Sequence, residues 1–239
     1  MKVAYHSQAM SRTPRSSPDW TQIDTVFLDM DGTLLDLRFD NYFWRELVPE
    51  RYAERQGMTT EEAQRELRPR FAAWEGRLEW YCLDHWTREL GLDLTALKHE
   101  VAERIAFRPS AQEFLAGLRP LGKRTALVTN ADRTALALKL ERTGLASHLD
   151  AHYSSHDFGL PKEDRAFWDR LRERERFDPA RTMLVDDSIA VLRAARAFGL
   201  RHLYQIGRPD TAAPARAPGE FEAVDSLLEL LNGGSSHPT

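Results

Sequence analysis

The sequence predicts an α/β protein in which a doubly wound parallel sheet is interrupted by an all-helical insertion. Residues 25–28 are apolar or β-branched and run directly into aspartates and a glycine, which is typical of a buried strand followed by a turn. From residue 38 to residue 105, apolar side chains recur at the spacing of helices. After residue 109, strand-like and helix-like runs alternate, and this pattern indicates right-handed βαβ units.

The helical interval contains several helices, because proline and glycine interrupt it repeatedly, at Pro49, Gly57, Pro69, Gly76 and Gly91. Thr59 and Glu62 have the spacing of a capping box, so one helix is expected to begin there. Cys82 is the single cysteine, which excludes an intramolecular disulfide, and it is expected to be a small buried residue within a helix.

The alternating part of the chain is expected to form strands at 124–129, 150–154, 182–186 and 201–206, and helices at 110–118, 133–143, from about 163, at 189–198 and at 221–231. Gly144 and Gly199 stand where glycine commonly ends a helix. The predicted organisation is therefore a core of residues 22–37 and 108–232, a helical domain at 38–107, a disordered lead-in at 1–21 and a flexible tail at 233–239.

Charge and hydropathy limit the partners. The 239 residues carry a net charge of −4 with both signs interspersed, which gives no electrostatic reason to expect a nucleic acid partner. No segment approaches the ~18 consecutive apolar residues of a membrane span, and the N-terminal residues lack the apolar stretch of a secretory signal. A cytoplasmic protein without membrane contact is expected, while the oligomeric state does not follow from the sequence.

Two aspartates follow the first predicted strand. Asp29 and Asp31 stand two positions apart, so in an extended segment both carboxylates face one small volume at the carboxyl end of the strand, where open α/β sheets bind ligands. Such a pair resists joint ionisation unless a cation lies between its members. Mg²⁺ is the expected cation, because it takes few carboxylates, keeps waters and completes its shell with a substrate phosphate.

Polar residues also follow later apolar runs and turns. Thr129 and Asn130 follow one predicted strand, Asp186 and Asp187 end another, and Lys162 comes after a Gly-Leu-Pro turn. Each segment alone is common in turns and on surfaces. Their occurrence together, in order and at strand ends or a helix start, predicts a site for phosphate and metal.

The run Asp29-Met30-Asp31-Gly32-Thr33 resembles the DxDGT signature of the haloacid dehalogenase-like hydrolases, and the three later segments resemble the remaining motifs of that family. The resemblance implies a Rossmann-like core with a C1-type helical cap. It also implies Mg²⁺-dependent hydrolysis of phosphomonoesters through an aspartyl-phosphate, which splits one difficult displacement into two easier ones.

The resemblance further implies a role for each matching residue. Asp29 is the nucleophile, and Asp31 is the acid that protonates the leaving alcohol and then the base that activates water. Thr129 binds phosphoryl oxygens with Asn130 adding donors, and Lys162 neutralises the charge of the nucleophile and the phosphoryl group. The implied metal ligands are the Asp29 carboxylate, the Asp31 main-chain oxygen, Asp187, and Asp186 either directly or through water.

Departures from the family pattern narrow the chemistry. Asp31 argues against the dehalogenase branch, whose members lack the second aspartate because no ester leaving group needs an acid. The helical insertion contains one lysine, Lys98, far from the position where phosphonate-cleaving relatives keep a Schiff-base lysine. A sugar-phosphate phosphatase or phosphomutase stays open as an alternative, and so does a non-catalytic binder of phosphate ligands.

Aromatic residues concentrate in the insertion, at 39–44 and 80–86, where they either stack on a nucleobase or pack the small cap, and composition alone favours packing. Five segments, 28–37, 39–44, 80–84, 140–145 and 161–164, resemble the bacterial GMP/IMP nucleotidases of the family, and the similarity runs over about residues 26–206. That implies 5′-nucleotidase action on 6-oxo purine mononucleotides. Discrimination against AMP needs a donor to O6 and an acceptor for N1–H. Asn41 is a candidate for either role, and Asp84 or Asp40 is a candidate acceptor.

Three histidines give a rival metal signal. His148, His152 and His156 recur every fourth residue and would share one face of a helix, as in some zinc sites. They follow the helix-ending Gly144 and lie in a segment expected to be extended and then irregular. Surface histidines are therefore the expected interpretation.

Overall fold

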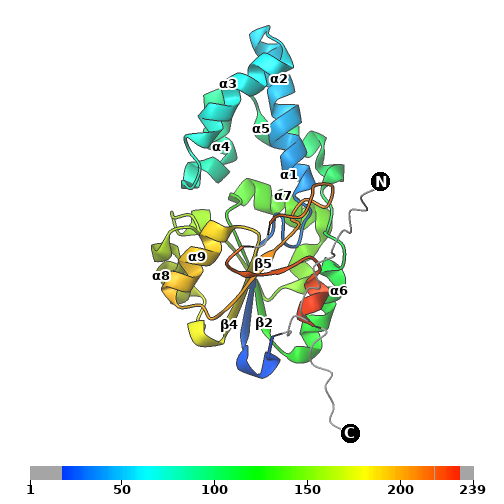
Figure 1. The fold of residues 1–239 in the computed structure, drawn as a ribbon. Coiled ribbons are helices and arrows are strands. Elements are labelled where there is room, and N and C mark those ends of the chain that lie inside the picture. Colours follow the sequence, from blue (N-terminus) through cyan, green and yellow to red (C-terminus); the bar gives the residue numbers. More distant parts are fainter. Residues whose placement is uncertain (1–17, 218, 232–239) are drawn as a thin grey trace, which may run out of the picture.

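The computed structural model describes residues 18–217 and 219–231, and it confirms the α/β fold (Figure 1). Within those residues one sheet has six parallel strands in the order β3-β2-β1-β4-β5-β6. The strands are β1 (Thr25–Leu28), β2 (Arg124–Thr129), β3 (Ala151–Ser154), β4 (Thr182–Asp186), β5 (His202–Ile206) and β6 (Glu222–Val224). Strand β1 lies in the interior, and the chain adds strands first on one side of it and then on the other, which is a doubly wound sheet.

The register of the central strands brings the polar residues to one edge. Leu28 in β1 pairs with Leu127 in β2 and with Val185 in β4. Asp29 and Asp186 directly follow the paired residues, so both lie at the carboxyl edge of the sheet. This is the edge where parallel α/β sheets bind ligands.

Helices cover both faces of the sheet because its strands are buried on both sides. Val26 and Leu28 point into a core shared with α6 (Ala111–Leu118) and α7 (Arg133–Thr143). Phe27 points into the opposite core, shared with α8 (Arg165–Arg174) and α9 (Ile189–Phe198). Figure 1 shows α8 and α9 on one side of the sheet and α6 on the other.

The segment between β1 and α6 is helical, as predicted, and projects beyond the sheet (Figure 1). It contains α1 (Arg38–Tyr42), a π-helical turn (Phe43–Leu47), α2 (Val48–Gln56), α3 (Thr60–Ala72), α4 (Leu83–Leu90) and α5 (Leu94–Glu100). The capping box at α3 is confirmed: the Thr59 hydroxyl accepts from the Glu62 N–H at 3.2 Å, and the Glu62 carboxylate accepts from the Thr59 N–H at 2.9 Å. Across the described part of the chain, every helix falls short of the length and apolar character that crossing a membrane requires.

The aromatic residues of the helical segment pack against one another. The Trp86 ring meets Phe71 edge to face at 4.8 Å and Trp44 at 6.3 Å, and Trp80 and His85 complete the cluster around it. Trp86 is fully buried, and its Nε1–H donates to the main-chain oxygen of Trp80. This arrangement favours the packing interpretation over base stacking for these rings.

The helix expected at 221–231 is wrong in its first half. Residues Glu222–Val224 instead form β6, which pairs with β5 in parallel, and only Leu227–Leu230 form a short 3₁₀ helix. Without β6 the backbone groups of β5 would be an unpaired edge, and pairing them outweighs the local helical pattern.

Three local expectations also need correction. Helix α8 begins at Arg165 rather than near Glu163, because Asp164 caps it by accepting from the Ala166 N–H at 2.8 Å. Cys82 is half-buried and precedes α4, where its Sγ accepts from the His85 N–H.

The third correction concerns the predicted lead-in at 1–21. Its last residues are ordered against the core, because the Trp20 indole N–H donates to the Leu230 main-chain oxygen at 3.0 Å. The expectations for residues 1–17 and for the tail at 233–239 lie outside the described residues.

Candidate active site

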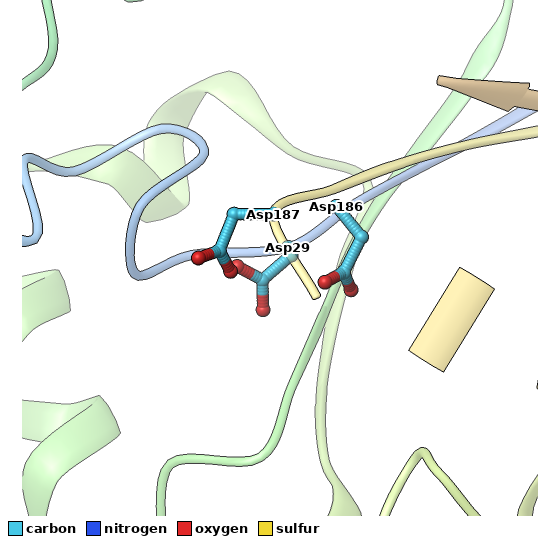
Figure 2. A group of neighbouring side chains, drawn as sticks. All are labelled: Asp29, Asp186 and Asp187. Atoms are coloured by element: carbon cyan, nitrogen blue, oxygen red, sulfur yellow. The ribbon is translucent and has the colours of Figure 1, made fainter. Parts of the chain in front are cut away.

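Three carboxylates converge at the carboxyl edge of the sheet (Figure 2). Asp29 follows β1, Asp186 ends β4 and Asp187 is the next residue, and one oxygen from each lies within 4.8 Å of the others. Asp29 and Asp186 are buried, and Asp187 is half-buried. The parallel pairing of β1 with β4 brings Asp29 beside the adjacent pair Asp186 and Asp187, which lie more than 150 residues later in the sequence.

Lys162 compensates part of this negative charge. Its Nζ donates to Asp29 Oδ1 at 2.7 Å, to Asp186 Oδ2 at 2.8 Å and to the Val128 main-chain oxygen at 2.9 Å. The side chain is fully buried, so these contacts form away from bulk water. Burial would lower the pKa of Lys162, but the Asp186 and Asp29 carboxylates outweigh it and raise the pKa, so the ammonium stays charged.

The three carboxyl groups at this edge resist ionisation. Burial raises the pKa of Asp29 to about 7 and that of Asp187 to about 7, and it raises the pKa of Asp186 to about 6. Like-charged neighbours add to the effect, while Lys162 opposes it. A divalent cation held between the carboxylates would allow all three to be ionised together.

The donor set fits a hard cation. The three side chains offer only carboxylate oxygens, the ligands that Mg²⁺ prefers, and they leave positions for water and a phosphate oxygen. In residues 18–217 and 219–231 this is the one group of three or more acidic, histidine or cysteine side chains close enough to share an ion. His148, His152 and His156 do not form such a group, since they lie in a 3₁₀ turn, in β3 and in a second 3₁₀ turn.

Thr129 and Asn130 lie beside Lys162 as the sequence predicts. Thr129 ends β2 and is buried, and its Oγ1 accepts from the Ala131 N–H at 3.1 Å. The Asn130 amide oxygen accepts from the Lys162 N–H at 2.9 Å, which fixes the loop that carries the lysine. The Asn130 amide N–H₂ donates to Glu163 at 2.9 Å. The neighbourhood of the two residues is therefore polar and preorganised.

Tyr81 joins the helical segment to this loop. Its hydroxyl donates to the Glu163 carboxylate, which also accepts from Asn130. A second contact lies close by, where the Leu83 N–H donates to the Asp132 carboxylate that caps α7. Sequence reasoning missed both contacts, because each pairs a residue of the insertion with one far along the chain.

Asp31 has a buried cation of its own. Lys139 in α7 places its Nζ 2.7 Å from Asp31 Oδ1 and 2.7 Å from Asp40 Oδ2, and Lys98 donates to Asp40 Oδ1 at 2.8 Å. Burial raises the pKa of Asp31, and the Lys139 ammonium opposes that rise. Lys139 was not predicted as a site residue. Its spacing could have indicated burial, because it stands four residues after the buried Ala135, on the apolar stripe of α7.

Arg216 is a further site residue that the sequence did not indicate. Its guanidinium donates to the main-chain oxygen of Asp187 and, at 3.1 Å, to Asp187 Oδ2. The arginine comes from the connection between β5 and β6. It adds a second positive group at the acidic edge.

The candidate base-reading residues differ in their contacts and exposure. Asn41 is in α1, and its amide donates to Asp210 Oδ2 at 2.7 Å. Asp84 lies in the first turn of α4 and is exposed. Asp40 is held by two lysines through both of its oxygens, which removes it as a free acceptor for a base. The role of Asn41 and Asp84 in reading a base stays a prediction.

The family match and similar curated proteins both indicate a hydrolase. The family model for haloacid dehalogenase-like hydrolases matches residues 23–199. The GMP/IMP nucleotidase YrfG of Escherichia coli strain K12 is 46% identical over 212 residues, covering 89% of this chain and 96% of that protein. The nucleotidase of the same name from Shigella flexneri has the same identity and coverage.

Solved structures share the fold at low sequence identity. A haloacid dehalogenase-type phosphatase from Thermococcus onnurineus superposes with a TM-score of 0.74 at 20% identity, over 88% of this chain and 99% of that one. The L-2-haloacid dehalogenase of Xanthobacter autotrophicus with chloropropionic acid covalently bound gives a TM-score of 0.60 at 19% identity, over 90% and 100%. At these identities the likeness concerns the fold alone.

Proposed function

The chain belongs to the haloacid dehalogenase-like hydrolases and is a hydrolase, and from this premise we propose that it is a Mg²⁺-dependent 5′-nucleotidase that cleaves GMP and IMP. The single observation that supports the catalytic part most strongly is the convergence of Asp29, Asp186 and Asp187 within 4.8 Å, with Lys162 between two of them. The nucleotide specificity is supported by the 46% identity to GMP/IMP nucleotidases over nearly the whole chain.

The proposed reaction has two steps. In the first, an Asp29 carboxylate oxygen bonds to phosphorus as the ester P–O bond breaks, and Asp31 gives its proton to the leaving 5′-oxygen of the nucleoside. In the second, Asp31 takes a proton from water as the water oxygen bonds to phosphorus and the bond to Asp29 breaks. The products are a nucleoside and inorganic phosphate, and both aspartates return to their starting states.

The surrounding residues orient the nucleophile and bind charge. Lys162 holds Asp29 Oδ1 and so fixes the plane of the nucleophile. The Thr129 hydroxyl and the Asn130 main-chain N–H are the proposed donors to the phosphoryl oxygens, since the Asn130 side chain is engaged with Glu163 and the Lys162 N–H. Asp29, Asp186, Asp187 and the main-chain oxygen of Asp31 would hold Mg²⁺, which when bound supplies charge neutralisation for the carboxylates and the phosphoryl group.

The helices α1–α5 are the proposed cap, and they are the part of the molecule in which the substrate base would be read. The contacts from Tyr81 to Glu163 and from Leu83 to Asp132 dock this cap on the core next to Lys162. A cytoplasmic location also stays a prediction.

A panel of phosphomonoesters tests the proposal. Purified protein with Mg²⁺ should release phosphate from GMP and IMP far faster than from AMP or hexose phosphates, and Asp29→Asn should abolish the release. Loss of activity on removal of Mg²⁺ with a chelator, and its return on adding the metal, tests the cofactor. Preference for sugar phosphates would overturn the nucleotidase assignment, and an isomerised sugar phosphate among the products would indicate a mutase.

The base-reading residues need their own test. Alanine at Asn41 and at Asp84 should each reduce the preference for GMP over AMP if these side chains read the purine edge. An unchanged preference in either variant removes that residue from the proposal.

A further inference from the structure

We propose that Lys139 is a positioning residue for the acid–base carboxylate of Asp31, and that the cap holds Lys139 in place through Asp40 and Lys98. The inference rests on the proposed phosphomonoesterase function. It concerns how the leaving group is protonated, which neither the family match nor the named relatives address.

The contacts form an unbroken chain of opposite charges. Lys139 Nζ lies 2.7 Å from Asp31 Oδ1 and 2.7 Å from Asp40 Oδ2, and Lys98 Nζ lies 2.8 Å from Asp40 Oδ1. The side chain of Lys139 is 2% exposed and that of Lys98 is 3% exposed. Two carboxylates therefore balance two ammonium groups, which is the condition under which buried charges are tolerated.

Asp31 and Asp40 differ in how many of their carboxylate oxygens contact a lysine. Both oxygens of Asp40 are bound by ammonium groups, so Asp40 serves as a fixed anchor. Lys139 contacts Asp31 through Oδ1, and the Asp31 side chain keeps an exposed fraction of 23%. Oδ2 is thus the oxygen of Asp31 that is available for proton exchange with a substrate. Fixing Oδ1 removes the rotation that would otherwise move Oδ2 away from a productive position.

The chain of charges crosses from the core to the cap. Asp31 follows β1 and Lys139 lies in α7, whereas Asp40 lies in α1 and Lys98 in α5. The Phe39 ring packs against both ammonium groups, with its centroid 5.4 Å from Lys139 Nζ and 4.9 Å from Lys98 Nζ. The position of the cap on the core therefore determines the position of Lys139 through Asp40, and Lys139 in turn determines the position of the Asp31 carboxylate.

The contacts of Lys139 with Asp31 and Asp40 account for a lysine at this buried position of α7. Burying an ammonium group costs free energy, and an apolar side chain at this buried position of α7 would pack without that cost. Lys139 contacts Asp31 and Asp40, whereas Lys162 contacts Asp29 and Asp186. Lys162 therefore orients the proposed nucleophile, Asp29, and Lys139 orients the proposed proton donor, Asp31.

Leaving-group dependence distinguishes this role from a general structural one. The nucleoside 5′-oxygen departs poorly without a proton, whereas the nitrophenolate of para-nitrophenyl phosphate departs without one. The parameter to compare is kcat/KM, because it covers only the events up to departure of the leaving group, whereas kcat also includes the hydrolysis of the aspartyl-phosphate that both substrates share. In Lys139→Met, kcat/KM for GMP should fall about 100-fold, the range of a lost acid–base contribution, while kcat/KM for para-nitrophenyl phosphate should fall less than about fivefold. Lys139→Arg should recover part of the GMP activity, because the guanidinium also pairs with a carboxylate.

Two controls keep the outcome interpretable. Lys162→Met should slow both substrates alike, since it acts on the nucleophile. If Lys139→Met does not fold, the double variant Lys139→Met with Asp40→Asn removes one charge of each sign and should show the same selective loss. Circular dichroism and thermal unfolding establish that the compared variants are folded.

An equal loss of kcat/KM for the two substrates, or no loss of kcat/KM for GMP, would overturn the role of Lys139. Failure of the wild-type protein to hydrolyse any phosphomonoester would instead overturn the proposed function. If the wild type prefers a sugar phosphate to GMP, that alkyl ester takes the place of GMP in the comparison and the test of Lys139 is unchanged.

Discussion

Lys162→Met is expected to lower the stability of the protein strongly, because it leaves buried carboxylates without their cation. Lys162 bonds Asp29, Asp186 and the Val128 main-chain oxygen at 2.7, 2.8 and 2.9 Å, and its side chain is 2% exposed. Removing one partner of a buried ion pair costs about 3–5 kcal/mol. For a chain of this length about 1 kcal/mol corresponds to a Tm change of about 2–4 °C, so Tm should fall by about 6–20 °C.

Thermal unfolding without metal measures this loss, and the same scan with Mg²⁺ adds a second comparison. Mg²⁺ should raise the Tm of Lys162→Met more than that of the wild type, since more uncompensated carboxylate charge is available to bind it. Lys123→Met is the matched control, because Lys123 precedes β2 and takes no part in the acidic group. If the two variants unfold at the same temperature, Lys162 does not compensate the buried acids and the electrostatic reasoning fails.

Three further changes test other contacts. Tyr81→Phe removes the hydroxyl that donates to Glu163 and should raise KM for GMP several-fold in steady-state assays while kcat changes little. Gly32→Ala should lower activity at least about tenfold, because φ is +87° there and a Cβ would lie 2.9 Å from Asp187 Cγ; wild-type activity would contradict this. Burial raises the pKa of Glu175, but hydrogen bonds from Arg124 and Tyr153 outweigh it and lower the pKa. The pairing therefore stabilises the fold above the ordinary carboxyl pKa, and this contribution is lost as the pH falls through the lowered value. Glu175→Gln should be less stable than the wild type in urea near neutral pH and equally stable in strong acid.

The central sheet and the acids at its edge were predictable from the sequence because their signals are local. An apolar run that stops at Asp29 specifies both a strand and the place where it ends, and the same holds for the run that stops at Asp186. Parallel strands of one doubly wound sheet then bring these ends to the same edge. At these positions the local sequence pattern and the sheet topology predict the same placement of the acids, so the sequence alone was sufficient to predict it.

The contacts between distant elements were not predictable in the same way. Lys139 and Asp40 are 99 residues apart, and Arg216 is 29 residues from Asp187. Neither pairing has a sequence spacing of its own, since each depends on how the cap or the β5–β6 connection packs on the core. Strand β6 was missed for a related reason: the unpaired edge of β5, rather than the local pattern, decides its conformation.

The arrangement of the two lysines explains how neighbouring aspartates can take different roles. Asp29 and Asp31 are two residues apart and would repel each other if they shared one environment. Asp29 shares Lys162 with Asp186, while Asp31 shares Lys139 with Asp40, so each carboxylate has a separate buried cation and a separate second acid. Different partners give the two groups different surroundings and different tendencies to hold a proton, which is what the proposed division into a nucleophile, Asp29, and an acid, Asp31, requires. Because Asp40 lies in α1 and is held there by Lys98 of α5, displacement of the proposed cap should disturb the proposed proton transfer by Asp31 while leaving Asp29 and Lys162 in place.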